Sequence, residues 1–354
     1  MEKRKLGNTG TEVTSLGIGA MSFSDFYGPT DTKESHAILK MALDYGLDHI
    51  DTAKVYGMGL SEERIGAFLK TLGSNNQQFF KIATKGGIDR KNFNDKGTVH
   101  FDNSKDFLTK ELDASLKRLG IDSVELYYVH RREVQRPIEE VTETLVGFIK
   151  AGKIKQFGFS EIAPTSLSEA AKIHPVGAIQ SEYSLSTRYP ELGLLQRAKA
   201  LGASLVAFSP VGRSLLTDKP HSLATVQTME FLKSNPRFTE PNLTNNVKAT
   251  EKFREYASDL GCKASGLAIA WLLKKDTHVL PIPGTRSVDH LKEMIHGASL
   301  NLTDENMKEI EEIDYEYLQK NEFGITPLQR KFYEHRKRLL EGLISNYINS
   351  SDEE

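Results

Sequence analysis

The sequence predicts an α/β protein: a (β/α)8 TIM barrel with an N-terminal β-hairpin and extra C-terminal helices. Short β-branched or apolar runs alternate with longer amphipathic segments over most of the 354 residues. This alternation is typical of βα units around a parallel sheet. No Pro/Gly/Ser-rich linker interrupts the series, so one closed barrel fits it better than two domains.

Eight apolar runs supply the strands of this barrel, and a small hairpin is expected before them over 3–6 and 12–16. The strands are expected near 17–20, 47–50, 79–84, 124–129, 155–159, 178–180, 204–208 and 279–282. Their amphipathic partners are 32–45, 61–72, 105–119, 138–151, 166–174, 191–201, 263–274 and 288–296.

Capping residues mark the ends of these expected helices. Suitable starts are Asn103 or Ser104, Pro137 in a first turn, Thr165 and Ser287. Glycines that should end helices in a left-handed conformation are Gly46, Gly73, Gly120, Gly152 and Gly202.

The barrel should occupy residues 1–302, with a long insertion at 211–245 after the seventh strand. Such an insertion covers a substrate pocket or forms a surface loop. Residues 303–354 form a C-terminal extension, in which apolar residues recur at helical spacing: Phe332, Leu339, Leu340, Leu343, Ile344 and Tyr347. We expect this helix to pack on the barrel or on another subunit, and in the second case the tail would form a homo-oligomer contact. The alternative is a helix that lies on a membrane surface.

Composition narrows the range of partners and compartments. Lys plus Arg number 46 against 48 Asp plus Glu, a net charge of −2, so nucleic acid is not an expected partner. No apolar run approaches the ~18 residues that span a bilayer, and the first residues are charged, so we expect a soluble, cytoplasmic protein without membrane contact. Cys262 stands alone and cannot form an internal disulfide, and no metal-site spacing is found.

Ionisable side chains follow three neighbouring predicted strands. Asp51 comes after the second strand in HIDTAKVYG with Tyr56 five residues later, Lys85 closes the third strand in IATKGG, and His130 follows the fourth in YYVHRR. Functional residues of such barrels gather at the carboxyl ends of the strands. Each residue alone has a structural explanation: Asp51 as a turn or N-cap residue, Tyr56 as a packing residue, Lys85 as a solvated strand end and His130 as a hydrogen-bonded buried histidine. Four such residues on one rim indicate an active site.

The four residue types suit carbonyl reduction. Hydride addition leaves an oxyanion, and the Tyr56 phenol can protonate it. We expect the Lys85 ammonium to lower the pKa of Tyr56, Asp51 to hold Lys85 charged, and His130 to polarise the carbonyl.

On these motifs the chain resembles the aldo-keto reductase superfamily over 4–301. The matching segments are LGNTGTEVTSLGIGAM, GLDHIDTAKVYGMGLSEERIG, IATKG, LDASLKRLGIDSVELYYVHR, IKQFGFSE, AIQSEYS, FSPVGRSLL and PIPGTRS. The resemblance implies that Asp51, Tyr56, Lys85 and His130 form the catalytic tetrad, with Tyr56 as general acid. It also implies reduction of a small-molecule carbonyl substrate.

The segment after the eighth strand suits a phosphate. No GxGxxG or GxxxxGK[ST] motif is present. The next helix offers backbone N–H groups at Gly284, Thr285 and Arg286, and the Arg286 side chain adds a planar cation. The alternative is a capped helix followed by a solvated arginine. By resemblance, the GTRS motif contacts the adenosine 2′-phosphate, so NADPH/NADP+ is expected rather than NADH.

The same resemblance assigns the rest of the coenzyme site. Ser160 and Gln180 should bind the nicotinamide carboxamide, and the ring of Phe208 should stack on the nicotinamide. The pyrophosphate path should be lined by Ser209, Val211, Gly212 and Arg213. Two positions depart from the usual pattern: Glu161 stands where Asn is common, and Glu293 is followed by Met294 rather than by Asn near the adenine.

Two questions stay open at this stage. The first concerns Phe23, Phe26 and Tyr27, which form either an aromatic wall of the substrate pocket or packing at the rim of the barrel. The second concerns Arg131 and Arg132, which either attract an anionic substrate or form structural ion pairs. An alternative function is a cofactor-bound regulatory or redox-sensing subunit of the potassium-channel β-subunit type. An intact tetrad favours turnover.

Overall fold

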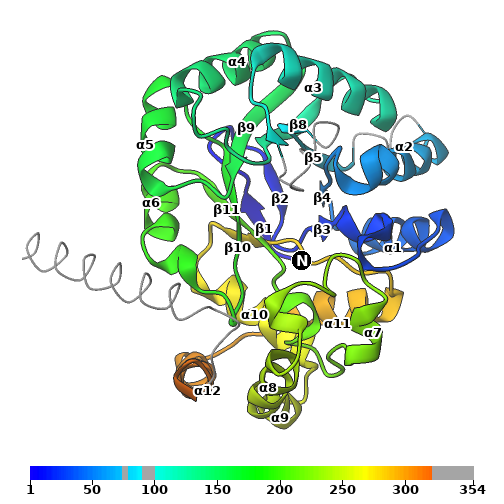
Figure 1. The fold of residues 1–354 in the computed structure, drawn as a ribbon, viewed down its shortest axis with the longest axis vertical. Helices are drawn as coiled ribbons and strands as arrows, with labels where there is room; N and C mark the ends of the chain where they lie inside the picture. Colours follow the sequence, from blue (N-terminus) through cyan, green and yellow to red (C-terminus); the bar gives the residue numbers. More distant parts are fainter. Residues whose placement is uncertain (74–78, 90–99, 321–354) are drawn as a thin grey trace, which may run out of the picture.

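The computed structural model describes residues 1–73, 79–89 and 100–320, and its central feature is a parallel sheet of eight strands (Figure 1). The strand order is β3 (Ile18–Gly19), β4 (His49–Asp51), β5 (Lys81–Gly86), β8 (Val124–Val129), β9 (Ile154–Ser160), β10 (Ala178–Glu182), β11 (Ser204–Phe208) and β12 (Val279–Pro281). The backbone N–H groups of Gly17 and Gly19 donate to the carbonyls of Pro281 (3.0 Å) and Pro283 (2.9 Å). These bonds join the first strand to the last, so the predicted barrel is confirmed.

The N-terminal hairpin closes one end of this barrel. Its strands are β1 (Lys3–Lys5) and β2 (Glu12–Thr14), paired antiparallel as predicted. Leu6 and Val13 are fully buried among apolar side chains of the barrel interior, including Leu126 and Val206. The hairpin therefore fills this end of the barrel with apolar side chains.

Helices surround the strands (Figure 1), and eight of the described helices alternate with the strands along the chain. They are α1 (Thr32–Tyr45), α2 (Leu60–Thr71), α3 (Lys105–Leu119), α4 (Ile138–Lys150), α5 (Pro164–Ile173), α6 (Leu194–Ala200), α10 (Ala264–Lys275) and α11 (Val288–Gly297). Their apolar faces bury the main core against the outside of the sheet. A second short antiparallel pair, β6 (Ile88–Asp89) with β7 (His100–Phe101), was not predicted.

Three predicted helix boundaries are wrong. Gly73 does not end α2 in a left-handed conformation, because Leu72 is already extended after Thr71. Thr165 is not a cap: α5 begins at Pro164, whose fixed φ suits a first turn. The helix expected from 191 begins only at Leu194, since Gly193 (φ 116°) interrupts the chain. The left-handed glycines at Gly46, Gly120, Gly152 and Gly202 are confirmed.

The insertion after β11 forms helices of its own and extends beyond the predicted 245. It contains α7 (Leu223–Gln227), α8 (Asn242–Ala249) and α9 (Glu251–Asp259) with short 3-10 turns between them. A separate apolar cluster holds it together: Leu215, Val226, Met229, Leu232, Phe238 and Leu243. Because this cluster is buried, the insertion is a packed element and not a loose surface loop.

The C-terminal extension begins with α12 (Asp304–Lys320), which lies at the lower edge of Figure 1. Ile310 of α12 is fully buried in the main core, and Glu311 accepts a bond of 2.8 Å from Lys275 of α10. The tail residues expected in a further helix, from Phe332 to Tyr347, lie outside the described residues. Among the described helices, none combines the length and the apolar character that crossing a bilayer requires.

Helices α10 and α11 cross where two glycines touch, which gives a test of the packing. A Cβ added at Gly297 would lie 2.3 Å from the Cα of Gly266. Gly297→Ala is therefore expected to lower the free energy of unfolding by about 1–3 kcal/mol through overpacking. Gly147→Ala in α4 is the matched control, because nothing lies within 4 Å of its added Cβ and alanine favours a helix. Thermal unfolding should separate the two variants, and equal midpoints would contradict this packing.

Candidate active site

The four predicted catalytic residues meet at the carboxyl end of the barrel. Asp51 is the last residue of β4, Lys85 lies in β5, and His130 directly follows β8. Strands β4, β5 and β8 are neighbours, with Lys85 opposite Tyr128 in the register. Tyr56 begins a 3-10 turn in which Gly57 (φ 63°) is left-handed, and this tight turn places the phenol back over the strand ends.

Lys85 is the centre of the group. Its Nζ bonds Asp51 Oδ1, donates to the carbonyl of Thr52 at 3.0 Å and reaches the Tyr56 hydroxyl at 3.3 Å. The Lys85 side chain has no exposed surface and that of Asp51 is 2% exposed. Burial disfavours the ammonium, but Asp51 and Tyr56 outweigh this, and the net pKa of Lys85 is raised. The lysine is therefore a buried cation at neutral pH.

Gln180 supports this ion pair from the far side of the barrel. Its Nε2 donates to Asp51 Oδ2 at 2.8 Å, so the carboxylate is bonded through both oxygens. The sequence placed Gln180 at the coenzyme and did not indicate this second contact. The bond fixes the carboxylate that in turn fixes Lys85.

The Tyr56 ring lies between two other rings. It meets His130 edge-on at 5.8 Å between centroids and Phe26 at 6.1 Å. Burial raises the pKa of Tyr56, and the Lys85 ammonium opposes this rise without reversing it. Lys85 thus acts on this pKa in the expected direction, but desolvation of the phenolate is the larger effect and the net pKa is raised.

The loop between Asp51 and Tyr56 is braced by an ion pair that the sequence did not reveal. Lys54 Nζ lies 3.0 Å from Glu111 Oε1 of α3, and these side chains are only 13% and 12% exposed. Below it, fully buried Glu62 accepts bonds from Thr84 (2.6 Å) and Arg118 (2.7 Å). The Lys54–Glu111 pair thus anchors the tyrosine loop to α3, and Glu62 joins α2 to β5 and α3.

One cavity of about 1040 Å³ connects the tetrad with the expected coenzyme residues. Asp51, Tyr56 and His130 line one part of it. The remaining wall includes ten of the predicted coenzyme residues: Ser160, Gln180, Phe208, Ser209, Val211, Arg213, Gly284, Thr285, Arg286 and Glu293. Gly212 is buried behind this wall and does not line it.

The two residues expected at the nicotinamide carboxamide have protein partners. Ser160 Oγ accepts from Arg131 Nη1 at 2.9 Å, and Gln180 donates to Asp51. The hydroxyl of Ser160 retains its own hydrogen for a ligand. Glu161, the departure from the usual Asn, accepts from Ser181 Oγ (3.1 Å) and from the backbone of Glu182 (2.9 Å). Its carboxylate thus joins β9 to β10.

Arg213, expected along the pyrophosphate path, takes part in a cluster over the cavity. Its Nη2 bonds Glu182 at 3.2 Å, and Glu182 also accepts from Arg237 at 2.5 Å. Burial raises the pKa of Glu182, but the two guanidinium groups outweigh it and the net direction is downward. The Glu182 carboxylate thus holds both arginines in place, and of the two Arg213 lines the cavity.

The far end of the cavity carries a cation, Arg286. Arg286 donates to the carbonyls of Pro29 (2.7 Å) and Gly28 (3.3 Å), and within the described part of the chain no carboxylate pairs with it. Burial and the nearby Arg286 and His290 lower the pKa of His221. This cluster suits the phosphate that the sequence predicted. Nearby, Glu293 accepts from Ser265 (3.1 Å).

An aromatic wall forms beside Tyr56, and two of the three expected residues contribute to it. Phe26 and Tyr27 line the cavity, whereas Phe23 is only 1% exposed and belongs to the core. Phe231 of the insertion completes the wall, with ring centroids 5.8 Å from both Phe26 and Tyr27. The sequence offered no signal for Phe231, since the insertion approaches the rim only through its own fold.

The architecture is that of a TIM-barrel enzyme whose active site lies at the carboxyl ends of the strands. The chain belongs to the aldo/keto reductase family, because the model of that family matches residues 15–315. It is 35% identical to the aldo-keto reductase yakc [NADP(+)] of Schizosaccharomyces pombe over 87% of this chain and 90% of that protein. It is 34% identical to the probable aldo-keto reductase 1 of Glycine max, with 86% and 87% covered.

Solved structures agree with this assignment. The glycerol dehydrogenase AKR11B4 from Gluconobacter oxydans superposes with a TM-score of 0.76 at 25% identity, covering 90% of this chain and 97% of that one. The holo form of the aldo-keto reductase AKR11C1 from Bacillus halodurans gives a TM-score of 0.72 at 26% identity, covering 88% and 96%.

Proposed function

We propose that this protein reduces small aldehydes or ketones with NADPH, with Tyr56 as the proton donor. One observation carries the proposal: the buried ammonium of Lys85, paired with Asp51, lies 3.3 Å from the Tyr56 hydroxyl at the wall of a cavity that continues to Arg286. The fission-yeast relative is named as an NADP(+) aldo-keto reductase, which supports the choice of coenzyme.

The coenzyme residues fit an extended dinucleotide with a phosphate at its far end. Ser160 and Gln180 would bind the carboxamide, Phe208 would stack on the nicotinamide, and Arg286 would contact the 2′-phosphate. The pyrophosphate would lie along Ser209, Val211 and Arg213, with Gly212 shaping the turn, and Gly284, Thr285 and Glu293 would border the adenosine.

When bound along these residues, NADPH would supply the hydride for the carbonyl carbon. The hydroxyl of Tyr56 donates its proton to the oxygen as negative charge develops there, and His130 donates a hydrogen bond to the same oxygen. Lys85 stabilises the phenolate left on Tyr56. Asp51 keeps Lys85 in place, and Gln180 keeps Asp51 in place.

The direct test follows the absorbance of NADPH with a panel of aldehydes, including nitrobenzaldehyde, pyridoxal and sugar aldehydes. Consumption of NADPH that depends on the aldehyde supports the proposal. A tightly held coenzyme that does not exchange, with no turnover on any aldehyde, would instead favour the regulatory alternative.

The coenzyme assignment predicts a selective defect. Arg286→Ala should raise the Kd for NADPH by about 10- to 100-fold, because a charge-assisted bond to the phosphate is lost, and should change the Kd for NADH less than about twofold. Fluorescence titration of both coenzymes measures this. Arg197→Ala on the exposed side of α6 is the control and should change neither value. Equal losses for NADPH and NADH would count against 2′-phosphate recognition.

A further inference from the structure

Arg131 places a cation in the wall of the active-site cavity. It lines the cavity together with Tyr56 and His130 and is half-buried. Its Nη1 donates to the carbonyl of His130 (2.6 Å) and to Ser160 Oγ (2.9 Å). In the described parts of the chain no carboxylate pairs with Arg131, and its Nε and Nη2 groups donate to no residue there.

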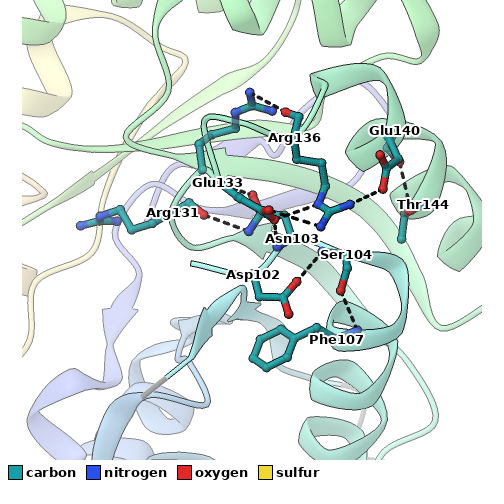
Figure 2. A network of polar contacts seen from close by, with 10 residues as sticks. Asp102, Asn103, Ser104, Phe107, Arg131, Glu133, Arg136, Glu140 and Thr144 are labelled. Atoms are coloured by element: carbon teal, nitrogen blue, oxygen red, sulfur yellow. Dashed lines mark hydrogen bonds and ion pairs between the residues drawn. The ribbon is translucent and has the colours of Figure 1, made fainter. Parts of the chain in front are cut away.

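Two carboxylates that follow Arg131 in the chain are engaged elsewhere. Glu133 accepts from Arg136 Nε (2.8 Å) and from the backbone of Asn103 (2.8 Å), and Glu140 pairs with Arg136 Nη1 (2.5 Å). Figure 2 shows this network, with the Arg131 side chain turned away from it. Asn103 Nδ2 also donates to the carbonyl of Arg131 at 3.1 Å. The network therefore fixes the backbone of Arg131 and leaves its guanidinium to the cavity.

Carboxylates of the cavity wall are also occupied. Glu182 is shared by Arg213 and Arg237, and Glu161 accepts from Ser181 and from the backbone of Glu182. A half-buried guanidinium with free N–H groups on two of its nitrogens presents the planar fork that carboxylates bind. No such acceptor comes from the described chain, so the partner that fits is a ligand.

We propose that Arg131 binds a carboxylate of the substrate, so that the enzyme prefers aldehydes that carry one. This rests on the proposed reductase function. The aldehyde would meet Tyr56 and His130, and the carboxylate would meet Nε and Nη2 of Arg131. The rings of Phe26 and Phe231 make an aromatic ring a suitable spacer between the two groups.

The experiment compares 4-carboxybenzaldehyde with its methyl ester, which has a similar shape and no charge. For the wild type we expect kcat/KM to be higher for the acid. Arg131→Gln should lower that value for the acid by about 10- to 100-fold and change it for the ester less than about threefold. Arg131→Lys should recover part of the loss, since it keeps the charge without the fork. Calorimetry with 4-(hydroxymethyl)benzoate on the NADP+ complex should show the same order of affinities.

Arg132→Gln is the matched control, since it removes the same charge one residue away. The Arg132 guanidinium bonds the carbonyl of Arg136 (3.3 Å), and it is not among the residues lining the cavity. It should leave the ratio of acid to ester unchanged. Equal losses on both substrates in Arg131→Gln, or a fall in NADPH affinity with an unchanged ratio, would overturn the inference. In that case turnover of the ester would still support the reductase function, whereas no turnover of any aldehyde would reject that function itself.

Discussion

Tyr56→Phe is expected to lower kcat for aldehyde reduction by about 100- to 10,000-fold, the range that loss of a general acid produces. The ring contacts with Phe26 and His130 need no hydroxyl, so the cavity should keep its shape. The Kd for NADPH should stay within about twofold of the wild-type value. Single-turnover decay of NADPH absorbance with excess aldehyde measures the chemical step directly.

The control for this variant is Tyr45→Phe, which removes the hydroxyl of a tyrosine that is 49% exposed at the end of α1. It should behave as the wild type in both rate and coenzyme affinity. If Tyr56→Phe kept more than about a tenth of the wild-type rate, water or another group would have to supply the proton, and the role proposed for Tyr56 would be lost.

The barrel was predictable because local signals and the global fold agree. Apolar runs such as Val124–Val129 and Ser204–Phe208 are buried along almost their whole length, so hydrophobicity alone marks them as strands. Helix starts were harder. Both Asn103 and Ser104 can cap a helix, and only the fold separates them: Ser104 Oγ caps α3, while Asn103 bonds Glu133 and Arg131.

The site was predictable where function follows from position at a strand end. Asp51, Lys85 and His130 needed only the rule that carboxyl ends of parallel strands meet at one rim. Contacts between distant segments were not predictable. Phe231 reaches the rim through the packing of the insertion, and the bond from Gln180 to Asp51 crosses the barrel, so neither leaves a pattern in the local sequence.

The same burial that makes Lys85 effective predicts a large effect on stability. Lys85→Met leaves the carboxylate of Asp51 buried, and Gln180 is then its remaining side-chain donor among the described residues. Breaking a buried pair on one side costs about 3–5 kcal/mol, so the free energy of unfolding should fall by that amount. The rate of reduction should fall by at least about 100-fold, because the phenolate of Tyr56 loses its cation.

A second substitution separates these two effects. Adding Asp51→Asn to Lys85→Met removes the uncompensated charge, and the amide oxygen can still accept from Gln180, so most of the lost stability should return. Activity should stay as low as in the single variant, since no cation lies beside Tyr56. Urea unfolding measures the first quantity and NADPH consumption the second. If the double variant regained activity along with stability, the role of Lys85 would be to stabilise the fold and not to assist Tyr56. If the single variant lost no stability, the carboxylate of Asp51 would have to be less desolvated than its 2% exposure indicates.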